Sequence, residues 1–112
     1  MKREFIYFKT FEKHWRELGL TDNELIFLEN LLMDNPNTGD VIQGTGGLRK
    51  MRLALPHKGK SGGARVLYVD FVSHEKTILM AVYAKNEQEN ISDVQKQQYK
   101  KLILALSKEL EK

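Results

Sequence analysis

The chain has 112 residues, of which 41% are hydrophobic and 29% are charged. This length fits one domain, and the composition is that of a globular protein rather than a disordered tail or a fibre. No apolar run approaches the roughly 18 residues of a membrane helix, and the N-terminus lacks the apolar stretch of a secretory signal. The absence of cysteine excludes disulfides, thiolate metal sites and a cysteine nucleophile. We therefore expect a single domain over residues 1–112, cytoplasmic and without a membrane partner.

Positive charge is concentrated in one part of the chain. The formal net charge is +3, from 18 Lys and Arg against 15 Asp and Glu. Residues 41–69 contain six basic residues, no acidic residue and six of the eight glycines, whereas the rest of the chain carries 12 basic and 15 acidic residues. A local positive field beside exposed backbone attracts polyanions. This segment is the first candidate for a functional surface.

The first third of the chain predicts one strand followed by two helices. Residues 4–9 are aromatic and β-branched, which favours a strand. Apolar residues at helical spacing over 11–18 predict a short helix that ends at Gly19. A capping box at 21–24 begins a second helix, and Pro36 ends it because the residue before proline avoids the α region.

The apolar period changes to two from residue 48, which predicts a strand with two different faces. In LRKMRLAL (48–55), the odd-numbered residues from 49 to 55 are expected on the core face. Lys50, Arg52 and Ala54 are expected on the opposite, basic face. The Gly- and Pro-rich residues 56–63 read as a flexible connection.

The remaining elements complete the fold prediction. Residues 64–72 and 77–85 read as two further strands, with His74 in the hairpin turn between them. A second capping box at 92–95 begins a helix whose apolar stripe runs to the C-terminus: Tyr99, Leu102, Ile103, Leu106 and Leu110. Segregated helices and consecutive strands predict an α+β fold with a largely antiparallel sheet.

Several catalytic motifs are absent. Gly59-Lys60-Ser61 is similar to the end of a P-loop, but Ala54 stands where the pattern needs glycine and no helix pattern follows. His14, His57 and His74 are too scattered for a metal or catalytic spacing, and His14 is expected to pack or face solvent. Carboxylate acid–base chemistry is disfavoured because the basic segment contains no acidic residue. We expect no metal and no cofactor.

Cations from neighbouring strands are expected to gather on one face of the sheet: Lys50, Arg52, Arg65 and Lys85. Such a face can hold phosphates, and the aromatic rings of Tyr68 and Tyr83 can stack on bases. The alternative is a solvated basic face that only keeps the protein soluble.

The sequence VIQGTGGLRKMRLALPHKGKSGGARVLYVDF, followed by VYAKNEQENIS, resembles the RelE/HigB-type toxins of bacterial type II toxin–antitoxin systems. The likeness is closest to the HigB-like branch, and GTGGLRK, SGGAR and YAKNE carry it in the order of the family. It implies a RelE-like α+β fold: a curved, mainly antiparallel four-stranded sheet flanked by N-terminal helices and a C-terminal helix.

The resemblance also implies a function and partners. It implies a ribosome-dependent endoribonuclease that cleaves mRNA in the decoding site, beside ribosomal RNA, and thereby inhibits translation. A helix-turn-helix, HigA-like antitoxin would hold it inactive, and operator DNA would be contacted only indirectly, through that complex. Metal-free cleavage uses the 2′-hydroxyl of the RNA as nucleophile and needs a proton acceptor, phosphate-stabilising cations and a proton donor. A non-enzymatic RNA- or phosphate-binding module is the alternative function.

Site residues follow from the matched positions. Arg52 and Arg65 are expected to stabilise the phosphate, and Lys50 or Lys85 to transfer protons. Some RelE relatives carry a catalytic tyrosine after the last strand, but residues 87–98 contain none. Two alternatives follow: Tyr83 or Tyr68 substitutes for it, or this branch acts without such a tyrosine. Further residues are expected to contact RNA: Arg49, Lys58, Lys60 and Tyr68.

Overall fold

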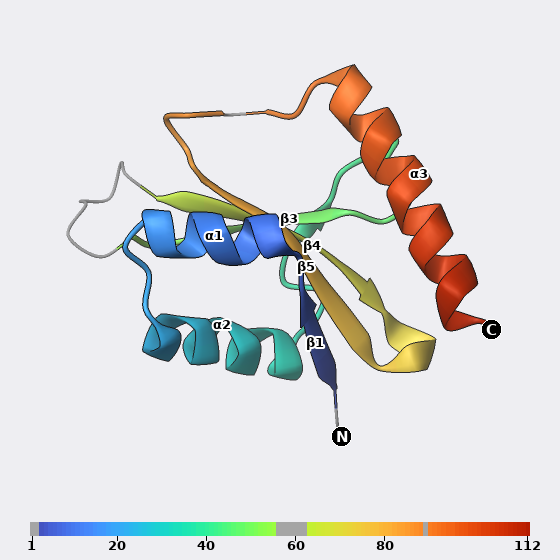
Figure 1. The fold of residues 1–112 in the computed structure, drawn as a ribbon, viewed down its shortest axis with the longest axis horizontal. Coiled ribbons are helices and arrows are strands. Elements are labelled where there is room, and N and C mark those ends of the chain that lie inside the picture. The colour runs from blue at the N-terminus through green and yellow to red at the C-terminus, as the bar shows by residue number, and fades with distance from the viewer. Residues whose placement is uncertain (1–2, 56–62, 89) are drawn as a thin grey trace.

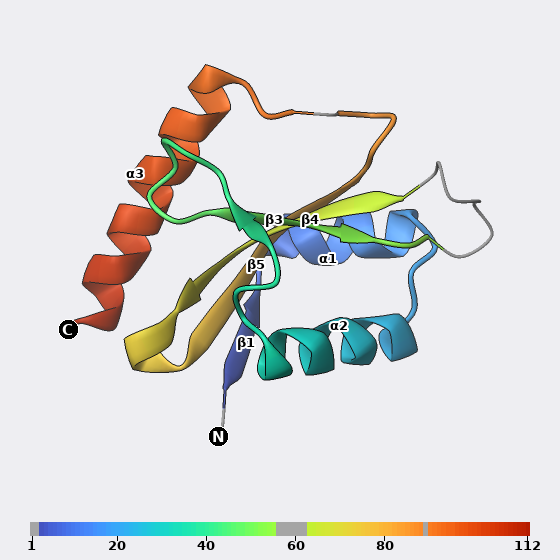
Figure 2. The same ribbon diagram turned by 180° about the vertical axis from the view of Figure 1, so that it is seen from behind.

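The structure is a computed structural model that describes residues 3–55, 63–88 and 90–112. In chain order its elements are β1 (Glu4–Tyr7), α1 (Lys9–Glu17), α2 (Asp22–Asp34), β2 (Asp40–Val41), β3 (Arg49–Leu53), β4 (Ala64–Phe71), the 3-10 turn η2 (Val72–His74), β5 (Lys76–Ala84) and α3 (Asp93–Leu110). Within the described residues, five strands form one sheet in the order β1-β5-β4-β3-β2. Helices α1 and α2 lie on one side of this sheet and α3 on the other (Figures 1 and 2).

The predicted α+β fold is confirmed, with two differences in the sheet. β2 is a two-residue strand that pairs antiparallel with the start of β3, and its length is too short to leave a periodic pattern in the sequence. β1 pairs with β5 in parallel, while β2–β3, β3–β4 and β4–β5 are antiparallel. Both predicted capping boxes, at Thr21 and at Ser92, are present with reciprocal side-chain and backbone bonds.

One hydrophobic core fills the space between the sheet and the two N-terminal helices. Phe11 and Trp15 of α1 stack with their ring centroids 5.5 Å apart, and Leu28 and Leu32 of α2 are fully buried beside them. The sheet contributes the side chains that alternate toward this face: Met51, Leu53, Ala64, Val66, Tyr68, Leu79 and Val82. The predicted core face of the 48–55 segment is therefore confirmed for residues 51, 53 and 55.

A second core lies under α3 and covers only part of the opposite face. Ile103 of α3 is buried with Leu48, Leu67 and Val69. Residues 42–48, which contain the GTGG motif, form a tight loop in which Thr45 Oγ1 donates to the Ile42 carbonyl at 2.6 Å and accepts from the Leu48 amide at 3.0 Å. Gly44, Gly46 and Gly47 all have positive φ, so this motif shapes the loop beneath α3. The predicted stripe on α3 is wrong at one position, because Leu102 is 38% exposed.

A buried ion pair fastens the N-terminal strand to the sheet. Arg3 donates to the carboxylate of Asp70 on β4, and the two side chains are only 3% and 2% exposed. Thr77 of β5 donates to the same carboxylate oxygen of Asp70 at 2.7 Å. A charge buried this deeply is costly unless its partner remains in place. The position of β1 therefore depends on this contact.

Replacing Asp70 tests that dependence. We expect Asp70→Ala to lower the free energy of unfolding by about 3–5 kcal/mol, because it leaves the Arg3 charge buried without its partner. Lys76→Gln, which breaks the exposed ion pair between Lys76 and Glu4 on the neighbouring strand, should change it by less than about 1 kcal/mol. Urea unfolding of both variants measures the difference. Equal effects would contradict a special role for the buried pair.

Candidate functional site

Three polar side chains stand in a row across neighbouring strands. In the β3–β4 pairing Arg52 lies opposite Arg65, and in the β4–β5 pairing Arg65 lies opposite Tyr83. Directly opposed residues project from the same face of a sheet, about 5 Å from one another. This is the face that α3 covers only in part. The predicted juxtaposition of Arg52 and Arg65 is therefore confirmed, and Tyr83 extends the row.

A groove of about 740 Å³ runs along this row at the β3 edge of the sheet. Lys50, Arg52 and Arg65 line it with Asp40 and Asn90, and the β2–β3 register pairs Asp40 directly with Lys50. None of these three cations forms an ion pair within the described residues. The groove is therefore a cationic surface with one carboxylate at its rim.

Asp40 is a site residue that the sequence reasoning missed. The expectation that no carboxylate belongs to the basic surface came from the acid-free run of residues 41–69. Asp40 stands immediately before that run, and the short strand β2 brings it back beside Lys50. A two-residue strand is too short to leave a sequence pattern from which its pairing can be predicted.

Arg65 is a buried residue, although it belongs to the cationic face that the sequence predicted. It is only 8% exposed, since β4 is the central strand, whereas Arg52 on the edge of the sheet is exposed. Within the described residues, the Arg65 guanidinium has one hydrogen bond, from Nη1 to the carbonyl of Ala64 at 3.3 Å. Because the Arg65 guanidinium has so few described partners, most of its N–H donors remain available to a ligand in the groove.

The Tyr83 hydroxyl is buried without a hydrogen-bond partner among the described residues. Burial raises the pKa of Tyr83 above its ordinary value; the nearby Arg65 lowers it in part, and Tyr99 raises it. The hydroxyl therefore stays protonated at neutral pH and can act as a donor. A buried donor without an acceptor costs free energy, and a ligand that supplies the acceptor would recover that cost.

The structure places Lys85 outside the groove. Lys85 follows the end of β5; its side chain is exposed and its backbone amide donates to the Gly63 carbonyl at 2.9 Å. Lys85 lines neither the groove nor a separate cleft between α1 and the end of β5. Lys58 and Lys60, together with His57, lie outside the described residues.

The structure corrects one of the predicted RNA contacts, Tyr68, and shows that another, Arg49, bonds to the backbone. Tyr68 is fully buried on the opposite face of β4, where its hydroxyl donates to the Pro36 carbonyl and accepts from the Gly39 amide, both at 2.8 Å. Arg49 donates to the Gly39 carbonyl at 2.6 Å and so holds the same turn. A Cβ at Gly39 would approach a Tyr68 ring atom to 2.9 Å, so this close packing requires glycine. Tyr68 is therefore structural, because strand alternation separates it from Arg65.

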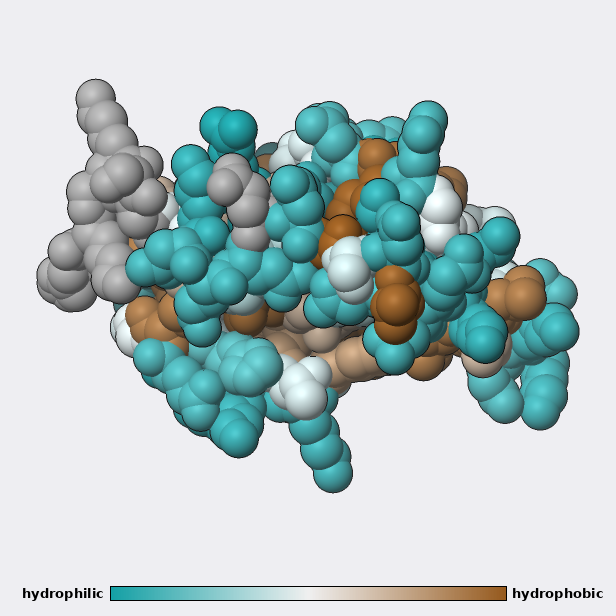
Figure 3. Space-filling view, turned by 90° about the horizontal axis from the view of Figure 1, so that it is seen from above, coloured by the Kyte–Doolittle hydropathy of each residue, from teal (hydrophilic) through white to brown (hydrophobic). Residues whose placement is uncertain are grey.

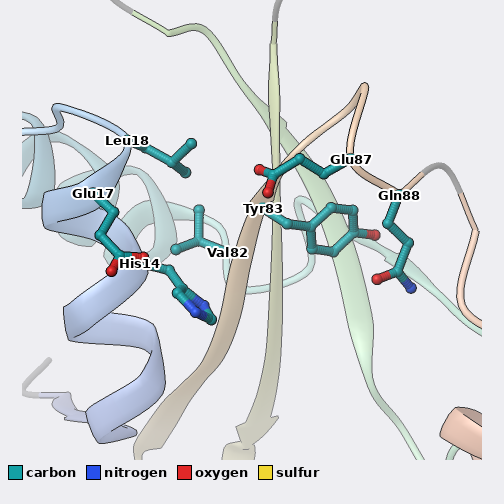
Figure 4. A pocket seen from close by; sticks show the side chains of 7 residues that line it. All are labelled: His14, Glu17, Leu18, Val82, Tyr83, Glu87 and Gln88. Atoms are coloured by element: carbon teal, nitrogen blue, oxygen red, sulfur yellow. The ribbon is translucent and has the colours of Figure 1, made fainter.

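A cleft of about 510 Å³ adjoins Tyr83 on the side away from Arg65. It is lined by residues of α1, β5 and the segment after β5: His14, Glu17, Leu18, Val82, Tyr83, Glu87 and Gln88 (Figure 4). The last amide bond between β1 and β5 runs from Phe8 to Leu79, so beyond this point α1 rather than a strand lies beside β5. His14, which the sequence predicted to pack or face solvent, is exposed and lines this cleft.

The described residues contain neither a cluster of side chains that could hold a metal ion nor a helix that could cross a membrane. No group of three or more His, Asp or Glu side chains there is placed to hold a metal ion. Within residues 3–55, 63–88 and 90–112, no helix combines the length and apolar character that crossing a bilayer requires. Exposed apolar side chains occur on α2 and α3. On the face that Figure 3 shows, hydrophobic residues form separate patches among hydrophilic ones.

The fold and groove define a small α+β protein with a cationic site suited to a polyanion. Residues 4–112 match the family described as the RelE toxin of the RelE / RelB toxin-antitoxin system, and the chain belongs to this toxin family. Its fold is similar to that of the E. coli toxin RelE in the free state, in a form with two arginine-to-alanine substitutions. The TM-score is 0.56 at 17% identity, over 80% of this chain and 90% of that chain. The predicted resemblance is confirmed at the level of the family; neither match separates the HigB-like branch.

Tyr83 offers a test that separates function from stability. Tyr83→Phe should leave the free energy of unfolding unchanged or slightly higher, because the lost hydroxyl has no partner in the described fold. If the hydroxyl serves the toxin, growth arrest on expression should weaken. Tyr7→Phe is the matched control, since the Tyr7 hydroxyl is also buried without a described partner but belongs to the other core. Full toxicity of Tyr83→Phe would show that the Tyr83 hydroxyl has no role in the function of the site.

Proposed function

We propose that this toxin is an mRNA endoribonuclease that acts on the ribosome and cleaves RNA without a metal ion, through the 2′-hydroxyl of the substrate. The observation that carries the proposal is the row of Arg52, Arg65 and Tyr83, which presents two cations and an unpartnered donor on one sheet face. Family membership supports a toxin with an antitoxin partner.

The row suits the charge that develops during RNA cleavage. Attack by the 2′-hydroxyl forms a pentacovalent phosphorane with extra negative charge on its oxygens, and the leaving 5′-oxygen needs a proton. Arg52 and Arg65 are suited to stabilise the phosphorane, since strand pairing holds their backbones in fixed register. Tyr83 is suited to donate toward the leaving oxygen, because its raised pKa keeps it protonated.

Two groups at the groove can accept the proton of the 2′-hydroxyl. Lys50 and Asp40 are paired across β2 and β3 and both line the groove. A carboxylate is an acceptor at neutral pH without further adjustment, whereas a lysine must first lose its proton. Asp40 is accordingly the proposed acceptor, with Lys50 holding the phosphate beside it.

The decisive experiment compares cleavage of translated and free RNA by the purified protein. Arg52→Ala should lower cleavage on ribosomes about a hundredfold, which is the usual effect of losing one transition-state donor. Its free energy of unfolding should stay within about 0.5 kcal/mol of the wild type, because Arg52 is exposed. Arg65→Met should abolish cleavage and still fold, since methionine keeps the apolar length of the buried side chain.

Arg16→Ala is the control, an exposed arginine on α1 whose loss should leave cleavage unchanged. Cleavage of free RNA as fast as of translated RNA would overturn the ribosome dependence. A requirement for an added transition-metal ion, in a buffer whose Mg²⁺ keeps the ribosomes intact, would overturn the metal-free chemistry. RNA binding by the wild type without any cleavage would favour the non-enzymatic binding module instead.

For the partner we propose a helix-turn-helix antitoxin of the HigA type that binds this toxin tightly. The unpaired cations of the groove steer an acidic partner toward it, so the association rate should fall with ionic strength. Stopped-flow association with the co-expressed antitoxin at roughly 50 and 500 mM salt measures this, and a severalfold fall is expected. An unchanged rate would contradict steering by the groove.

A further inference from the structure

The cleft beside Tyr83 is rich in hydrogen-bond acceptors, in contrast to the cationic groove. Glu87 uses one carboxylate oxygen to accept from the Ala84 amide at 3.0 Å, and no described residue donates to its other oxygen. Gln88 uses its amide nitrogen to donate to the Asn90 carbonyl at 3.3 Å and to Gln95 Oε1 at 3.1 Å, which leaves its own Oε1 as an acceptor. These contacts fix both side chains at the wall of the cleft.

Glu17 on the opposite wall has no stabilising role that the fold explains. It is the last residue of α1, where the helix dipole disfavours a negative charge. Its side chain is exposed and forms neither an ion pair nor a hydrogen bond within the described residues, yet it lines the cleft. A carboxylate in this position suits a ligand that brings hydrogen-bond donors.

The cleft also has surfaces that suit a flat ring. Leu18 and Val82 supply apolar contacts, and the rings of His14 and Tyr83 border the space between α1 and β5 (Figure 4). Stacking on aromatic side chains is a common way to hold an unpaired RNA base. The volume of about 510 Å³ lies in the range of small-molecule sites.

We propose that this cleft binds one base of the RNA strand, and that it prefers a base with an exocyclic amino group over uracil. This inference rests on the proposed function. Carboxylate and amide oxygens accept hydrogen bonds from the two N–H groups of the exocyclic amino group of cytosine, adenine or guanine, whereas uracil has a single N3–H donor flanked by two carbonyl oxygens that these acceptors repel. Glu17, Glu87 and Gln88 therefore determine which base is bound beside the cleaved bond.

The position of the cleft matches the path of a nucleotide. Arg65 and Tyr83 are opposed on adjacent strands and Tyr83 lines the cleft, so the cleft lies beside the row that would hold the phosphate. The carboxylates repel phosphate, and the groove attracts it. Together the groove and the cleft orient the RNA, with its sugar–phosphate backbone on β3 and β4 and one base beyond β5.

Substitution of Glu17 tests the proposal without disturbing the fold. Purified wild type, Glu17→Gln and Glu17→Lys are incubated with ribosomes translating a message library randomised around the cut, and the cleaved ends are sequenced. We expect the preference for amino-bearing bases over uracil at one position to fall about tenfold in Glu17→Gln. Glu17→Lys should reverse it, because lysine donates where glutamate accepts; both substitutions suit a helix C-terminus.

Glu111→Gln is the matched control, an exposed glutamate that caps the C-terminal end of α3. An unchanged base preference in both Glu17 variants would overturn the base-binding cleft and leave the proposed nuclease intact. Weaker binding to ribosomes at unchanged preference would assign the cleft to a ribosomal protein cation and likewise overturn it. A wild type that cleaves no message would overturn the proposed function, and the cleft with it.

Discussion

The site depends on one buried cation in an apolar strand. Residues 64–69 of β4 are all buried, and Arg65 is the only charged residue among them. A shift of the register by one residue would turn Arg65 into the core of α1 and α2, where the cost of burying a charge is several kcal/mol. The apolar pattern of β4 and the position of the cation therefore specify the same register, and this register brings Arg52 and Tyr83 beside Arg65.

The three helices cover the sheet unequally, which leaves the groove open. On one face α1 and α2 cover the sheet along a continuous core that includes residues from β3, β4 and β5. On the other face α3 and the loop at 42–48 cover the end near Leu48 and Val69 and stop short of Arg65. The GTGG motif thus acts through packing: its glycines let the loop pass beneath α3, and a Cβ at Gly46 would lie within 4 Å of Lys100 and Ile103.

Local patterns in the sequence were sufficient to predict the helices and strands. They were not sufficient to predict how all the strands pair. Capping boxes and apolar spacing predicted the helices because those signals lie within a few residues of one another. Alternation along β3 predicted that Arg52 faces away from the core. Alternation along β4 likewise places Tyr68 and Arg65 on opposite faces of the sheet. Asp40 and His14 join the site only through tertiary contacts, which no local pattern records. The burial of Arg65 follows from the central place of β4, a property of the whole sheet.

Three features that weaken the fold lie together at one end of the sheet. Arg65 is buried without a described carboxylate partner, the Tyr83 hydroxyl has no described acceptor, and Glu17 stands at the unfavourable end of α1. Elsewhere Arg3 and Asp70 are paired and the capping boxes are complete, although Arg3 Nε, Asp70 Oδ2 and the Tyr7 hydroxyl are also buried without a described hydrogen-bond partner. Arg65, Tyr83 and Glu17 differ in that each lines the groove or the adjoining cleft. Costs to local stability at such a place are expected where selection acts on binding rather than folding. In the proposed complex a nucleotide would meet all three at once, because its phosphate would pair with Arg65, an oxygen would accept from Tyr83 and an amino group would donate to Glu17.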